Sequence, residues 1–108
     1  CIVTSKRKIL ARRGLEIFNL QDYFSGIIGY EDTDKHKPNP DPINKALSLL
    51  NAKPEEAIMI GDSVFDIKCA KNAGIKSAFV SWSEAGDYQD NIVPDYTIGE
   101  LSQLLDII

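Results

Sequence analysis

The sequence predicts an α/β fold in which a mostly parallel sheet is covered by helices on both faces. Short apolar runs alternate with helical patterns along the whole chain. Alternating strands and helices form βαβ units with right-handed crossovers. The apolar runs are continuous rather than alternating, as is typical of strands covered on both sides. We therefore expect a three-layer sandwich in which residues 1–108 belong to one domain.

The first half of the chain predicts two strands and two helices. Residues 1–4 form a short apolar run, and Ser5 is expected to cap a helix over residues 6–18. Residues 26–30 predict a second strand, which a polar, proline-rich loop follows. A helix is expected to open at Asp41 and continue through Leu50, because Pro42 suits the first turn of a helix.

The second half continues the alternation. Residues 57–60 predict a third strand, and residues 64–73 predict a helix that ends at Gly74. A fourth strand is expected over residues 77–82. After a loop that contains Gly86 and Pro94, we expect a short strand over residues 96–98 and a final helix over residues 100–107.

Composition and charge exclude several classes of function. The chain has 108 residues, is 44% hydrophobic and carries a formal net charge of -4. No basic face dominates, which argues against a nucleic-acid-binding protein. No signal peptide and no apolar run of membrane-spanning length is visible in these residues, so we expect a cytoplasmic protein and no membrane partner. Its two cysteines, Cys1 and Cys69, do not indicate a disulfide framework.

Polar side chains are expected where three of the predicted strands end. The first strand ends in Thr4-Ser5, the loop after the second carries Lys37, and the third ends at Asp62. The carboxyl ends of parallel strands share one edge of a sheet, where open α/β sheets bind ligands. We therefore expect these groups to converge on one pocket.

The chemistry of these groups indicates phosphoryl transfer. A hydroxyl and backbone N–H groups at a helix start favour an anion, and a lysine in a proline-restricted loop supplies a positioned positive charge. Asp62 and Asp66 are one helical turn apart, so they repel unless a cation lies between them, and Mg²⁺ fits best. The alternative is structural: a Gly-Asp turn, with Asp66 as a solvated acid in the first turn of a helix.

Three segments resemble motifs of the haloacid dehalogenase (HAD) superfamily. Val3-Thr4-Ser5, Lys37-Pro38-Asn39-Pro40 and Gly61-Asp62-Ser63-Val64-Phe65-Asp66 are similar to its motifs II, III and IV. The similarity is greatest to phosphatases of the phosphoglycolate phosphatase and pyrophosphatase type. It extends to Asn72-Ala73-Gly74 and Pro94-Asp95-Tyr96. The resemblance implies a Rossmann-like fold and Mg²⁺-dependent hydrolysis of a small phosphorylated metabolite through an aspartyl-phosphate.

The resemblance also implies a role for each matching residue. Thr4 matches the hydroxyl that binds the transferring phosphoryl group, with the Ser5 N–H beside it. Lys37 matches the lysine that stabilises charge on the nucleophile and the phosphate. Asp62 matches the acid that binds Mg²⁺. Asp66 matches the second acid, which is more often a supporting or outer-shell group than a direct metal ligand.

One part of the family pattern is absent. The family's nucleophile is the first acid of a D-x-D motif on an earlier strand, but the one such motif here, Asp32-Thr33-Asp34, lies in a polar loop. The family's helical cap is also missing. The chain therefore resembles the C-terminal part of such an enzyme, and we expect it to be inactive alone. Without the nucleophile strand the sheet has unpaired apolar edges, so we expect it to rearrange or to pair with a second copy.

Two alternative functions, and the places or roles of three residues, are not decided by the motifs. A related phosphotransferase or mutase has the same motifs, and a non-catalytic binding or regulatory module would keep the sheet and the anion site. His36 is expected on the surface rather than in the site. Trp82 is expected to pack beneath the loop over residues 83–90, in the core or at its rim, rather than to stack on a ligand. Ser63 either contacts a metal-bound water or caps its helix.

Overall fold

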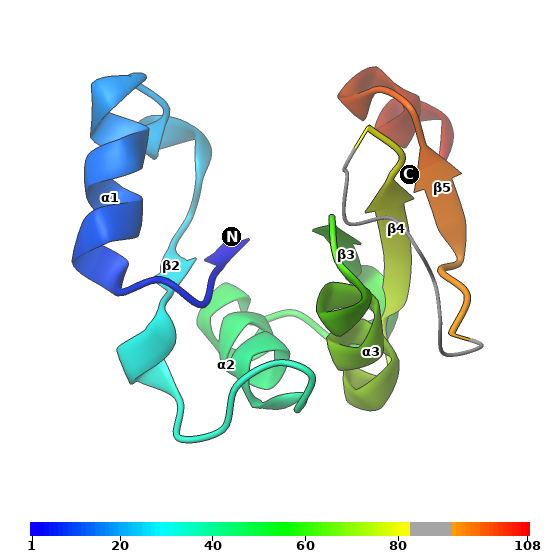
Figure 1. The fold of residues 1–108 in the computed structure, drawn as a ribbon, viewed down its shortest axis with the longest axis horizontal. Helices are drawn as coiled ribbons and strands as arrows, with labels where there is room; N and C mark the ends of the chain where they lie inside the picture. The colour runs from blue at the N-terminus through cyan, green and yellow to red at the C-terminus, as the bar shows by residue number, and fades with distance from the viewer. Residues whose placement is uncertain (83–91) are drawn as a thin grey trace.

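Parallel strands and α-helices alternate along the chain in the computed structural model, which describes residues 1–82 and 92–108 (Figure 1). This arrangement confirms the α/β class. The elements in order are β1 (Ile2–Val3), α1 (Lys8–Ile17), β2 (Ile27–Ile28), α2 (Asp41–Leu50), β3 (Ile58–Gly61), α3 (Val64–Ala73), β4 (Lys76–Val80) and β5 (Tyr96–Ile98). A 3-10 helix over Leu101–Asp106 stands where a final α-helix was expected.

The strands form two separate parallel sheets rather than one. β1 pairs with β2, with Val3 opposite Ile28. The second sheet has the order β3-β4-β5, with Ile60 opposite Ala78 and Ala78 opposite Tyr96. Within the described residues, no strand lies between β1 and β3, and the sheet has not rearranged to join them. The expected unpaired edges are therefore present: among the described strands, β1 pairs only with β2, and β3 pairs only with β4.

Helix α3 begins and ends where its sequence predicts. Ser63 has extended backbone angles, and its hydroxyl accepts a hydrogen bond from the Asp66 N–H at 3.4 Å. Of the two interpretations of Ser63, this geometry supports the helix cap. Gly74 adopts a left-handed conformation with φ of 75°, which glycine reaches without the steric penalty of a side chain. Both boundaries therefore follow from local chemistry.

The expected capping of the first helix by Ser5 is wrong. α1 begins at Lys8, its N-cap is Arg7, and no side chain of that cap bonds the first turn. The Glu31 carboxylate, from the segment after β2, instead accepts the Lys8 N–H at 2.8 Å. A distant segment therefore satisfies a backbone donor at the start of this helix, and the local sequence could not indicate it.

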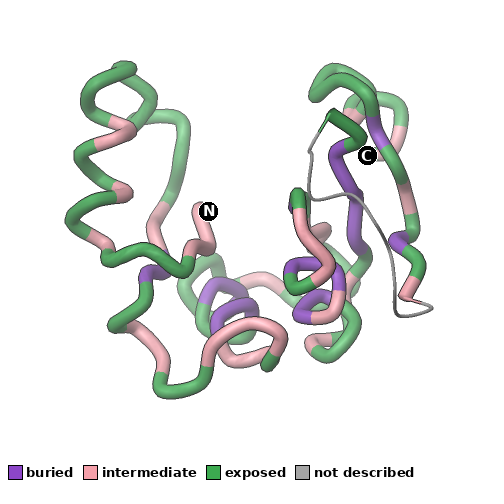
Figure 2. The backbone as a smooth tube through the Cα atoms, in the orientation of Figure 1, coloured by how far each residue is buried: buried purple, intermediate pink, exposed green. Residues whose placement is uncertain are grey.

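The hydrophobic core lies between α2, α3 and β3. One cluster of the core has Ile43, Leu47, Cys69 and Ala70 as its buried members, with Met59 of β3 packed against them. The β4 and β5 strands add Ala78, Phe79, Val80 and Ile98 to the buried apolar residues. α2 contacts both β1 and β2, and it also contacts α3, so these two helices bridge the two sheets. α1 contacts β2 but contains no buried residue, and most of its tube is coloured as exposed in Figure 2. The core therefore supports the C-terminal sheet more fully than the N-terminal one.

Two sequence expectations, the loop glycine and the packing of Trp82, involve residues that the structure does not describe. Gly86 lies within the span 83–91, outside the described residues. The same span contains residues 83–90, beneath which Trp82 was expected to pack.

Among the helices of residues 1–82 and 92–108, none is long and apolar enough to cross a bilayer.

Candidate active site

Two adjoining cavities lie where β1 and β3 end. The smaller, of about 310 Å³, is lined by Ser5, Lys37, Asp62, Ser63, Phe65 and Asp66. The larger, of about 440 Å³, shares Lys37, Asp62 and Asp66 and adds Thr4. All five residues singled out from the motifs therefore border one continuous region, although their chemical roles stay predictions.

Three separate elements bring these residues together. Thr4 and Ser5 directly follow β1, and Asp62 directly follows β3. β1 and β3 belong to separate sheets, but residues at the carboxyl ends of both strands line the larger cavity, so these two ends lie together. Lys37 comes from the long segment between β2 and α2, and Asp66 from the first turn of α3. The convergence therefore depends on strand direction, which the βαβ pattern predicts.

A buried ion pair joins the two sides of the region. Lys37 Nζ lies 2.7 Å from Asp66 Oδ1, and the side chains of Lys37 and Asp66 are only 13% and 8% exposed. The same ammonium group donates to the Val3 carbonyl at 3.1 Å. Charged hydrogen bonds of this length are strong, and they counter part of the cost of removing both charges from water. Lys37 is therefore held at the end of β1 by α3.

The second carboxylate oxygen of Asp66 organises the turn between β3 and α3. Asp66 Oδ2 accepts hydrogen bonds from the Asp62 N–H at 3.1 Å, the Ser63 N–H at 3.3 Å and the Ser63 hydroxyl at 3.2 Å. A Cβ atom at Gly61 would collide with the Asp66 side chain, so glycine allows this close approach. Both oxygens of Asp66 thus have protein partners, and through them Asp66 positions Lys37 and the turn between β3 and α3.

Of the two acids in this motif, Asp66 is buried and Asp62 is exposed, and Asp62 borders both cavities. Among the described residues, no group of three or more His, Cys, Asp or Glu side chains is placed to hold a metal ion. Mg²⁺ usually takes one or two protein carboxylates and completes its shell with water and substrate phosphate. One accessible carboxylate beside a lysine and hydroxyl groups fits part of such a site.

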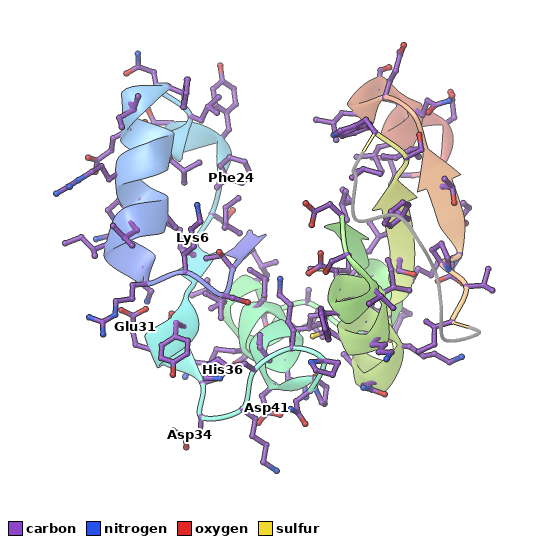
Figure 3. All side chains as sticks on the ribbon, in the orientation of Figure 1. Lys6, Phe24, Glu31, Asp34, His36 and Asp41 are labelled. Atoms are coloured by element: carbon purple, nitrogen blue, oxygen red, sulfur yellow. The ribbon has the colours of Figure 1, made fainter. Side chains whose placement is uncertain are left out.

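The D-x-D sequence of the loop lies outside this region. Asp32 accepts hydrogen bonds from the Gly29 N–H at 2.7 Å and from Lys8 Nζ at 2.9 Å. The Gly29 N–H, followed by Lys8, lowers the pKa of the Asp32 carboxyl from its usual value. Neither Asp32 nor Asp34 lines either cavity, and Figure 3 shows Asp34 pointing outward from the loop. Asp32 therefore has a structural role here.

His36 also lies outside both cavities, but it is half-buried rather than fully exposed. Its ring stacks on that of Tyr30, with centroids 4.3 Å apart and an angle of 4° between the planes. Its Nε2 hydrogen-bonds to the Tyr30 carbonyl at 2.9 Å. The stack therefore joins His36, which directly precedes Lys37, to Tyr30 near the start of the same segment.

Besides apolar residues of the strands, three large exposed side chains that the sequence analysis did not place in the site border the region. Phe65 lines the smaller cavity and is 55% exposed. Trp82 and Leu101 line the larger one and are 53% and 61% exposed. The position of Phe65 between Ser63 and Asp66 could have indicated its place. Leu101 had no such signal, because only the return of the chain through β5 brings it there.

Comparison with known proteins agrees with this geometry. A family model described as haloacid dehalogenase-like hydrolase matches residues 1–80. A relative from Caldanaerobacter subterraneus subsp. tengcongensis, named in the pyrophosphatase PpaX group, is 51% identical over 99% of this chain and 49% of its own length. Pyrophosphatase PpaX from Halalkalibacterium halodurans is 44% identical over 99% of the chain and 50% of its own length. The chain thus spans about half the length of these relatives.

Solved structures give the same result. A structure from Lactobacillus plantarum, assigned as a phosphoglycolate phosphatase, matches with a TM-score of 0.88 and 28% identity, over 99% of this chain and 51% of that one. The HAD hydrolase YfnB from Bacillus subtilis, solved with bound magnesium, matches with a TM-score of 0.85 and 28% identity, over 98% of this chain and 47% of that one. Because the family model matches residues 1–80, well over half of the chain, the chain belongs to the haloacid dehalogenase-like hydrolase family.

Proposed function

We propose that this chain supplies the phosphate-binding and Mg²⁺-binding part of a phosphatase that hydrolyses a small phosphorylated metabolite. The observation that carries the proposal is the convergence of Thr4, Lys37 and Asp62 on one cavity. A positive charge, a hydroxyl and an acid in one place are what a phosphate group and a hard cation require together. Residues 1–108 would then be the C-terminal part of a HAD-type core domain in a cytoplasmic enzyme.

Thr4, Ser5 and Lys37 would bind the phosphoryl group. The Thr4 hydroxyl and the Ser5 N–H would donate hydrogen bonds to its oxygens at the end of β1. Lys37 would stabilise the negative charge of the phosphoryl group and of the carboxylate nucleophile beside it. Its ion pair with Asp66 keeps the ammonium group in place before substrate binds, so little reorganisation is needed.

Asp62 would be the direct Mg²⁺ ligand, and Asp66 would support the site from behind. This division follows from their surroundings, because both oxygens of Asp66 already accept protein hydrogen bonds while Asp62 is exposed at the cavities. Bound Mg²⁺ would stabilise the negative charge of the phosphate. The magnesium bound to YfnB, a structural neighbour, supports the choice of metal.

The nucleophile would come from the part of the protein that this chain does not span. Covalent catalysis in this class needs an aspartate whose carboxylate oxygen attacks phosphorus and displaces the leaving-group oxygen, which takes up a proton. Water then hydrolyses the resulting aspartyl-phosphate to the free aspartate and inorganic phosphate. Asp32, the first acid of the D-x-D sequence in this chain, is engaged by Lys8 and Gly29 instead. The chain alone would therefore bind phosphate without turnover.

A fusion protein tests this proposal. The part of the Caldanaerobacter relative that this chain does not match would be joined to residues 1–108, since the two sequences are 51% identical where they overlap. We expect Mg²⁺-dependent release of phosphate from the fusion and none from the chain alone. Lys37→Ala and Asp62→Asn should each reduce kcat of the fusion by about 100-fold or more. Clear Mg²⁺-dependent turnover by the chain alone would contradict the proposed division of roles.

The substrate assay also separates the remaining candidates. Pyrophosphate and phosphoglycolate are the two substrates to compare, because relatives and neighbours carry those names. Phosphate binding without turnover of either compound by the fusion would favour the alternative, a non-catalytic binding or regulatory module. Transfer of phosphate to a second metabolite rather than to water would favour a phosphotransferase.

A further inference from the structure

Helix α3 holds the Lys37 segment through three side chains spaced three residues apart. Asp66 pairs with the Lys37 ammonium group. Cys69 Sγ donates to the Asn39 carbonyl at 3.0 Å, and Asn72 Nδ2 donates to the Pro38 carbonyl at 2.9 Å. Side chains at such spacing lie along one side of a helix. Three consecutive residues of the segment are therefore fixed by one side of α3.

The chemical state of Cys69 fits this contact. A carbonyl oxygen can only accept a hydrogen bond, so the thiol must keep its proton. Cys69 has no exposed surface, and burial raises the pKa of its thiol. The thiol therefore stays protonated near neutral pH and remains a donor.

We propose that Cys69 and Asn72 are positioning residues for Lys37, a role that rests on the proposed function. A lysine side chain is long and flexible, so its ammonium group is placed only as well as its backbone is fixed. Bonds to the carbonyls of Pro38 and Asn39 fix the backbone just after Lys37. They allow Lys37 Nζ to reach Val3 and Asp66 together at the edge of the cavity.

The competing explanation is that other contacts fix the segment without α3. His36 is stacked on Tyr30, and its carbonyl accepts both the backbone N–H and the side-chain amide of Asn39, each at 2.9 Å. If these contacts were sufficient, removing the donors of α3 would leave the surroundings of Lys37 unchanged. The two explanations therefore predict different accessibilities for the Lys37 amine once Cys69 or Asn72 is replaced.

Amine labelling of the chain itself measures that accessibility. Trace acetylation with acetic anhydride, read by mass spectrometry, gives the rate at Lys37 relative to the exposed Lys53. Loss of one hydrogen bond changes a local equilibrium by about two- to tenfold, so Asn72→Ala and Cys69→Ala should raise the relative rate by about that factor. Cys69→Ser keeps a donor and should restore the original rate. Asn44→Ala, at an exposed position of α2, is the matched control and should change nothing.

Unchanged Lys37 labelling in both alanine variants would overturn the proposal, and so would equal increases in Cys69→Ser and Cys69→Ala. The fusion protein adds a kinetic measurement. There, Asn72→Ala should lower kcat by about two- to tenfold and change KM less, because Lys37 acts mainly on charge that develops during the reaction. An inactive parent fusion would contradict the proposed function, whereas the labelling result would still decide the role of these two residues.

Discussion

The region around β1, α1 and β2 and the region around β3, α3 and β4 have the same strand–helix–strand pattern but differ in burial. β1 and β2 share two residue pairs, whereas β3 and β4 share four. α1 buries no residue, while α3 buries Asp66, Ile67, Cys69 and Ala70. Figure 2 shows this contrast as an exposed helix on one side and buried tube on the other. Equal local patterns thus give unequal packing.

The difference shows that apolar periodicity specifies where a helix forms, while the elements packed against that helix decide how much it adds to the stability of the fold. Ile9 and Ile17 of α1 are 64% and 67% exposed, although they fit an amphipathic helix. Ile67 of α3, by contrast, has no exposed surface. Burial of an apolar side chain contributes about 1.5–3 kcal/mol, so the second region holds most of the stability.

The largest expected effect concerns the unpaired edges where the two regions face each other. Exposed strand edges pair readily with other strands, so we expect the chain to self-associate and light scattering to give about twice the mass of one chain. Ile60→Lys places a charge on β3, beside the larger cavity, and should restore the monomer. Leu105→Lys, at an exposed site in the final 3-10 helix, is the control. A stable monomer at all concentrations would show that these edges need no partner.

The next effect concerns the ion pair that connects the regions. Asp66→Ala would leave the Lys37 charge buried without its partner and remove the acceptor of the β3–α3 turn. Breaking a buried pair costs about 3–5 kcal/mol. Urea unfolding should therefore show a loss of that size in the free energy of unfolding. Asp106→Asn, an exposed acid, should stay within about 0.5 kcal/mol of the parent. Similar losses for the two variants would mean that the pair does not join the regions.

A pair of alanine substitutions tests the difference in burial directly. Ile67→Ala empties a fully buried site in α3 and should cost about 2–5 kcal/mol. Leu10→Ala removes a similar volume from α1, where the side chain is 53% exposed, and should cost less than about 1 kcal/mol. Urea denaturation of both variants gives the comparison. If Leu10→Ala were as costly as Ile67→Ala, then α1 would be packed more tightly than the structure indicates.

The smallest effect is a pH dependence in the N-terminal region. The Gly29 N–H and Lys8 lower the pKa of Asp32 in the folded chain below its usual value of 3.8. A carboxyl with a lowered folded pKa stabilises the fold above its unfolded pKa and loses that contribution as the pH falls through the folded value. The difference in unfolding free energy between the parent and Asp32→Asn should therefore shrink as the pH falls below about 3.8. A constant difference across that range would contradict the assignment.

Much of the fold and of the candidate site could be predicted from particular residues. Ser63 and Gly74 mark the ends of α3 through local backbone chemistry, and both boundaries are confirmed. Thr4, Lys37 and Asp62 were placed together because parallel strands end at one edge, and they line one cavity. The start of α1 was predicted wrongly, because its partner Glu31 lies 23 residues away along the chain.

By itself, the sequence determined the order of strands and helices, their parallel direction and the edge at which the polar motifs meet. These follow from side-chain periodicity, from caps and turns, and from the handedness of βαβ units, all of which act over short distances. Only the tertiary structure decided that both carboxylate oxygens of Asp66 accept hydrogen bonds from the protein and that α3 fixes the Lys37 segment. It also decided that the strands divide into two sheets. Those outcomes depend on which distant groups come into contact, and contact between remote segments leaves no periodic signal in a single sequence.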